Sequence, residues 1–156
     1  MNSQRRLILK SSFATAALGT ALAAGLITPR HVMAANLSSA FSAASVDDVI
    51  KNMFAGQTRL TSNQVQIKAP DIAENGAVVP VSVETDLADV ETITLLVNNN
   101  ATPLVASYTF SADAEPYVST RIKMGKTSEV EAIVKAGGKL YTASKEVKVT
   151  IGGCGG

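Results

Sequence analysis

The chain has 156 residues, a length that suits one domain, and its 46% hydrophobic but only 4% aromatic residues favour a core of aliphatic side chains. Its formal net charge is +1, with one histidine, one cysteine and no tryptophan. Because no block of basic residues interleaved with aromatic residues occurs, nucleic acid is not an expected partner.

The first residues have the pattern of an export signal. Arg5 and Arg6 stand before an apolar stretch, and residues 11–28 are uncharged and rich in Ala, Leu and Gly. A paired-arginine head before such a segment is typical of the twin-arginine export route, whereas the interspersed glycines disfavour a membrane span. We predict that residues 1–34 are a twin-arginine signal peptide, that Ala35 becomes the first mature residue, and that the protein is periplasmic and not bound to a membrane.

Removal of this segment changes the chemical inventory of the chain. His31 leaves with it, and Cys154 remains as the single cysteine. A chain with no histidine and one cysteine cannot form a Cys-His dyad, a Ser-His-Asp triad or a zinc site of Cys and His ligands. Ten basic residues then stand against 13 acidic ones, a net charge of about −3. We therefore expect no catalytic residues, no metal and no cofactor.

Residues 45–55 have the pattern of a short helix. Ser45 stands three residues before Asp48, as in a capping box, and Gly56 follows the segment. Apolar side chains recur at helical spacing at Val46, Val49, Ile50, Met53 and Phe54. The pattern predicts an amphipathic N-terminal helix whose Asp47 and Asp48 are charges of the first turn.

Beyond Thr58 the apolar period changes to two residues, and turn residues recur about every ten positions. Alternating apolar residues predict strands near 65–67, 79–83, 93–97, 104–110, 117–124, 128–135 and 146–151. Asn75-Gly76 predicts a tight turn, and Gly137-Gly138 predicts a hairpin turn of the primed kind.

About seven short strands separated by regular turns are typical of two packed antiparallel sheets. We predict an all-β fold, an immunoglobulin-like antiparallel β-sandwich that spans residues 35–151 and includes the N-terminal helix. The disulfide and core tryptophan of antibody domains are absent from the sequence, so the prediction concerns architecture alone.

The chain ends in IGGCGG, which places Cys154 between two pairs of glycines, Gly152, Gly153, Gly155 and Gly156. Glycine offers no side chain to a pocket wall, and three residues beyond Ile151 give the sulfur a reach on the order of 10 Å. We predict that residues 152–156 form a flexible swinging arm. The nearest cation in the sequence is Lys148, so the thiol pKa is expected near the ordinary cysteine value, and activation must come from a partner.

Other interpretations of the tail remain open at this point. An unpaired cysteine in an exported protein can form an intermolecular disulfide, which would make the chain a binding or structural module that dimerises through Cys154. A tail without function and a thiocarboxylate carrier using Gly156 are further alternatives. A small redox enzyme is disfavoured because the chain has no second cysteine to resolve a mixed disulfide.

The tail and the segments before it resemble the SoxY family, the sulfur-carrying subunits of SoxYZ complexes in bacterial thiosulfate oxidation. The resemblance includes IGGCGG, PDIAENGAVVPVSVE at 70–84, TPLVASYTF at 102–110, and TRIKMGKTSEVEAIVKAGGKLYTASKEVKVT at 120–150. The resemblance extends over nearly all of the mature chain and includes the twin-arginine signal. One departure is NNNATPL at 98–104, where the family pattern leads us to expect a turn richer in proline.

The resemblance implies a carrier and not an enzyme. Cys154 would be the point of covalent attachment for thiosulfate-derived sulfur, and no cofactor would be needed. The implied partners are a SoxZ-like subunit in a heterodimer or larger assembly, a haem-containing SoxXA-like enzyme that conjugates thiosulfate, a SoxB-like hydrolase that releases sulfate, and a SoxCD-like sulfane dehydrogenase.

The sequence also leads to expectations about the subunit interface and about the charged residues of the strands. Because the twin-arginine route exports folded proteins, the SoxZ-like subunit is expected to leave the cytoplasm bound to this chain, through outward apolar positions of the strands or through the N-terminal helix. Arg121 and Lys123, and likewise Glu129 and Glu131, are expected to be charges of solvated strand faces and not an anion site or an acid/base pair.

Overall fold

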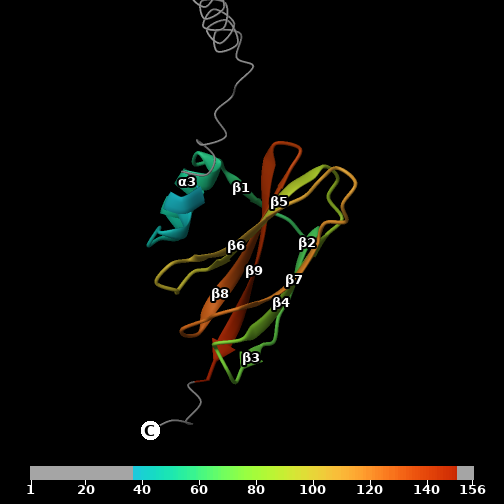
Figure 1. The fold of residues 1–156 in the computed structure, drawn as a ribbon. Helices are drawn as coiled ribbons and strands as arrows, with labels where there is room; N and C mark the ends of the chain where they lie inside the picture. Colours follow the sequence, from blue (N-terminus) through green and yellow to red (C-terminus); the bar gives the residue numbers. More distant parts are fainter. Residues whose placement is uncertain (1–36, 151–156) are drawn as a thin grey trace, which may run out of the picture. The chain divides into compact units, whose positions relative to one another are not determined.

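The computed structural model describes residues 37–150. Figure 1 shows two facing sheets and the helix α3 (Val46–Phe54). The strands are β1 (Arg59–Thr61), β2 (Val65–Lys68), β3 (Ile72–Ala73), β4 (Val79–Thr85), β5 (Val90–Val97), β6 (Leu104–Thr109), β7 (Tyr117–Ile122), β8 (Ser128–Ala136) and β9 (Lys139–Val149). The predicted signal peptide, 1–34, and the predicted arm, 152–156, lie outside the described residues.

The sheets form the predicted antiparallel sandwich. The larger sheet has the order β1-β9-β8-β5-β6, and the smaller one has the order β2-β4-β7. The pairs of β5 with β6, β5 with β8, β8 with β9, β2 with β4 and β4 with β7 are all antiparallel. The fold class expected from the sequence is therefore confirmed.

Two short strands depart from the antiparallel pattern. β1 and β3 both pair in parallel with β9, which is itself a single strand of 11 residues and starts well before the predicted residue 146. With three and two residues, β1 and β3 are too short to show an apolar period. Their place in the fold is decided by hydrogen bonds to β9.

The core between the sheets follows the two-residue period of the strands. Val79, Val81 and Val83 of β4 are at most 1% exposed, and Val130 and Val134 of β8 are fully buried. Burial of one such side chain stabilises a fold by about 1.5–3 kcal/mol. The expected core of aliphatic side chains is confirmed.

The helix α3 covers the other face of the larger sheet. Ser45 caps it by accepting a hydrogen bond from the Asp48 N–H at 3.1 Å, as the capping-box pattern predicts. Its buried residues pack on the sheet in a second apolar cluster made of Ala40, Ala43, Val49, Ile50, Phe54, Leu96, Leu104, Ile133 and Leu140. The apolar stripe of the helix is therefore occupied by its own domain.

The hairpin between β8 and β9 has the predicted turn. Gly137 and Gly138 have φ angles of 53° and 73°, the left-handed values that a primed turn needs and that glycine adopts without strain. In residues 37–150, no helix is long and apolar enough to span a membrane.

Candidate functional site

The predicted site residues, Cys154 with Gly152, Gly153, Gly155 and Gly156, lie outside the described residues. The structure does describe the place where the chain leaves the sandwich toward them, at the end of β9. We call this place the root and define it as residues 71–78 and 123–127 together with Lys148, Val149 and Thr150.

Hydrogen bonds hold the last residues of β9, and Thr150 directly after them, on both sides. The Lys148 N–H donates to the Asp71 carbonyl at 3.0 Å, and the Thr150 N–H donates to the Ala73 carbonyl at 3.1 Å. Between them, the Val149 N–H donates to Thr127 Oγ1 at 3.0 Å. Figure 1 shows β3 beside the end of β9. Since three consecutive N–H groups have partners, the chain is fixed as far as Thr150.

The turn at Asn75-Gly76 packs tightly against this end of the strand. The Val78 N–H donates to the Asn75 carbonyl, and the Met124 N–H donates to the Gly76 carbonyl at 2.7 Å. A Cβ on Gly76 would lie 2.3 Å from the Met124 carbonyl oxygen and 2.8 Å from Val149 Cγ1. The sequence predicts Gly76 as a turn residue, and the structure shows that close backbone approach requires it.

The asparagines after β5 hold the loop 123–127. Asn99 Nδ2 donates to the Thr127 carbonyl at 3.0 Å, and Asn100 Nδ2 donates to the Lys123 carbonyl at 2.8 Å. The Gly125 N–H donates back to Asn100 Oδ1 at 3.1 Å. The segment NNNATPL, where the family pattern led us to expect more proline, thus supports the root through side-chain amides that proline does not have.

The surface of the root carries two exposed apolar side chains. Ile72 is 58% exposed and Val78 is 50% exposed, whereas their neighbours Ala73 and Val79 are buried. Ile72 lies opposite Lys148 in the parallel register of β3 and β9, so both side chains stand on one face. Sequence periodicity alone does not single out these positions.

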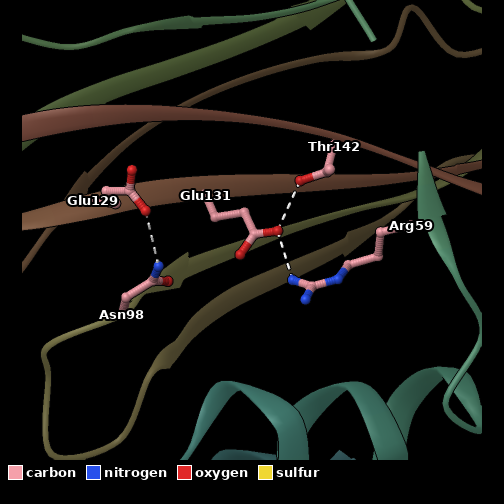
Figure 2. Close-up of polar contacts among 5 residues, drawn as sticks. All are labelled: Arg59, Asn98, Glu129, Glu131 and Thr142. Atoms are coloured by element: carbon pink, nitrogen blue, oxygen red, sulfur yellow. Dashed lines mark hydrogen bonds and ion pairs between the residues drawn. The ribbon is translucent and has the colours of Figure 1, made fainter. Parts of the chain in front are cut away.

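A polar cluster on the outer face of the larger sheet corrects one expectation (Figure 2). Glu131, expected at a solvated strand surface, has a side chain only 10% exposed and is paired with Arg59 Nη1 at 2.7 Å. The same Glu131 oxygen accepts a hydrogen bond from Thr142 Oγ1 at 2.8 Å, and Asn98 Nδ2 donates to Glu129 at 3.4 Å. Arg59 comes from β1, whose pairing with β9 the sequence does not predict, and for this reason the burial of Glu131 is not predicted either.

The hollow beside this cluster has a volume of about 360 Å³ and is lined by Arg59, Thr61, Glu129, Glu131, Thr142, Ala143 and Ser144. Its buried carboxylate already has a cation and a hydroxyl as partners, as a structural ion pair requires. In the described part of the chain, no group of three or more His, Cys, Asp or Glu side chains could hold a metal ion.

Comparison with solved structures supports the fold. A superoxide reductase (neelaredoxin) from Ignicoccus hospitalis is similar at 24% identity and a TM-score of 0.50 over 56% of this chain and 81% of that chain. A variant of that enzyme is 21% identical, with a TM-score of 0.51 over 59% of this chain and 94% of that chain. These likenesses concern the fold alone. A comparison with curated protein sequences finds no match.

A family model adds evidence from the sequence. The model described as "Sulfur oxidation protein SoxY" matches residues 50–154, a range that ends at Cys154. The structure of the sulfur carrier protein SoxY from Chlorobium limicola f thiosulfatophilum is 43% identical, with a TM-score of 0.64, over 74% of this chain and 98% of that chain. The match extends over the sandwich and the cysteine together, and this chain therefore belongs to the SoxY family of sulfur oxidation proteins.

Proposed function

We propose that this protein is a sulfur carrier that holds thiosulfate-derived sulfur covalently on Cys154 and presents it to partner enzymes, without being an enzyme itself. One observation carries the proposal, namely that the family match includes the only cysteine of the chain. The similar SoxY from Chlorobium limicola f thiosulfatophilum is a sulfur carrier protein. The bonded root supports the proposal because it gives a tethered thiol a fixed point of departure.

The geometry of a tether limits what the thiol can do. Cys154 is four residues beyond Thr150, so its Cα lies within about 14 Å of the Thr150 Cα. The glycines on each side have no side chains, which lets the cysteine enter a pocket too narrow for a bulkier segment. A thiol with these limits acts by entering the active sites of other proteins.

The first proposed step is oxidative conjugation. The S–H bond of Cys154 breaks, a sulfur–sulfur bond forms to the terminal sulfur of thiosulfate, and two electrons and one proton leave. A haem-containing, SoxXA-like enzyme takes up the electrons, and the product is a cysteine S-thiosulfonate. A SoxB-like hydrolase then uses water to release sulfate and leaves a persulfide on Cys154, which a SoxCD-like dehydrogenase oxidises further.

The remaining parts of the proposal concern place and assembly. We propose that the twin-arginine signal at 1–34 directs the folded chain to the periplasm, together with a SoxZ-like subunit that forms a heterodimer with it. Because α3 already packs its apolar stripe on the larger sheet, this stripe is not available to the second subunit.

Intact mass spectrometry of the native mature protein tests the carrier role. We expect adducts heavier by one or more sulfur atoms or by a thiosulfonate, removed by a reductant and absent in the Cys154→Ser variant. That variant is a matched control, since it keeps the size of the side chain and loses the nucleophilic sulfur. A species of twice the chain mass, with no sulfur adducts, would instead favour a structural disulfide.

A further inference from the structure

We propose that the exposed apolar side chains of the root, Ile72 and Val78, form a docking surface for the rim of the enzyme pocket that receives Cys154. The occupant is a partner enzyme whose reactive centre lies at the bottom of a pocket with an apolar rim. This inference rests on the proposed function, which makes Cys154 the reactive group.

The length of the chain beyond Thr150 limits the reach of Cys154. A pocket that accepts Cys154 must bring its reactive centre to the Cys154 sulfur, and the Cα that carries this side chain lies within about 14 Å of the Thr150 Cα. The deeper the reactive centre lies in this pocket, the closer the mouth of the pocket comes to the end of β9. The residues beside Thr150 must then contact the rim.

The residues beside the end of β9 include two exposed apolar side chains. The segment that carries Ile72 and Val78 is bonded to the end of β9 through the Ala73 carbonyl, and both side chains are at least half exposed. Nearby charges are already partly engaged, since Lys145 Nζ pairs with Asp71 at 3.0 Å and bonds the Ala69 carbonyl at 2.6 Å. Ile72 and Val78 therefore offer apolar contact to a partner, beside Lys148, which stands on the same face as Ile72.

Backbone hydrogen bonds order the segment that carries Ile72 and Val78. The bonds from Thr150 to Ala73, from Met124 to Gly76 and from Val78 to Asn75 hold the segment in one conformation. A rigid surface loses little conformational entropy when it docks, so a small contact area suffices. A small area also gives a short-lived complex, which suits a carrier that must leave one enzyme and reach the next.

The test uses the heterodimer carrying Ile72→Glu and Val78→Glu together, offered to the thiosulfate-conjugating haem enzyme. We expect kcat/KM for adduct formation on Cys154 to fall about tenfold or more, because two charges would be buried against an apolar rim. Alkylation of Cys154 by iodoacetamide, a reagent that needs no docking, should keep the wild-type rate.

Leu60→Glu is the matched control. Leu60 is 47% exposed and pairs with Tyr141 of β9, whereas Ile72 pairs with Lys148 of the same strand. Tyr141 and Lys148 are seven residues apart, so Leu60 and Ile72 are separated by about 23 Å along β9. It should be loaded at the wild-type rate.

Three results would overturn the inference while leaving the carrier role intact. The first is a double variant with the wild-type kcat/KM. The second is a double variant whose rate of alkylation by iodoacetamide falls as much as its kcat/KM for adduct formation. The third is a double variant that no longer binds the second subunit in size-exclusion chromatography. If wild-type protein gains no adduct, or if Cys154→Ser gains one, the proposed function itself is wrong.

Discussion

At the scale of single residues, the ion pair of Arg59 and Glu131 joins strands β1 and β8. The Glu131 side chain is 10% exposed, so its charge is largely removed from water and depends on its two partners, Arg59 and Thr142. An exposed ion pair contributes little, whereas loss of one partner of a buried pair leaves a charge without compensation.

We therefore expect Arg59→Met to lower the free energy of unfolding by about 2 kcal/mol, measured by urea denaturation. A further Glu131→Gln substitution should restore part of this loss, since it removes the uncompensated charge. Lys68→Met is the control, because Lys68 and Glu84 form a pair with side chains 65% and 36% exposed, and it should unfold close to wild type. If Arg59→Met and Lys68→Met lowered the free energy of unfolding by the same amount, the structural role of Glu131 would be contradicted.

At the scale of secondary-structure elements, Glu91 ties the start of β5 to the hairpin between β8 and β9. Its carboxylate accepts a hydrogen bond from Lys135 Nζ at 2.6 Å and another from the Gly138 N–H at 3.2 Å. The Lys135 ammonium, assisted by the Gly138 N–H, holds the pKa of Glu91 below its ordinary value. The folded state thus favours the ionised carboxylate.

The sign of the pH dependence follows from this lowered pKa. The stabilisation is present above the pKa of Glu91 in the unfolded chain and is lost as the pH falls through its lowered pKa in the folded protein. Thermal unfolding should show wild type more stable than Glu91→Gln at pH 7, and this difference should shrink toward pH 3. A difference that stays constant over this range would mean that the charge of Glu91 does not contribute.

At the scale of the whole molecule, the sandwich and the tail are predicted to be independent. The hydrogen bonds that hold Lys148, Val149 and Thr150 come from Asp71, Ala73 and Thr127, all within the sandwich. Removal of residues 152–156 should therefore leave the melting temperature unchanged in calorimetry while abolishing sulfur loading. Gly76→Ala, which brings a Cβ to 2.3 Å from the Met124 carbonyl oxygen, should lower it and so show that the assay detects damage at the root. A lower melting temperature of the truncated protein would show that the tail contributes to folding.

The sequence by itself determines the alternating strands, the turns and the cap of α3. A period of two predicts the buried face that Val79, Val81 and Val83 share. The pair Gly137-Gly138 predicts the left-handed turn, and Ser45 predicts the start of the helix. These features depend on neighbours in the chain, which a sequence displays directly. The family, too, is visible in the sequence, because Cys154 and its glycines stand in one short stretch.

Only the tertiary structure decides which distant residues meet. Arg59 reaches Glu131 across 72 residues, and Ile72 lies beside Lys148 through a strand of two residues that no period reveals. Burial of Glu131 and exposure of Ile72 both depend on what packs from another part of the chain. The period of a strand indicates which side chains share a face. Whether that face is buried or exposed depends on long-range strand pairing, which the period does not contain, and this is the physical reason that the sequence does not predict the root.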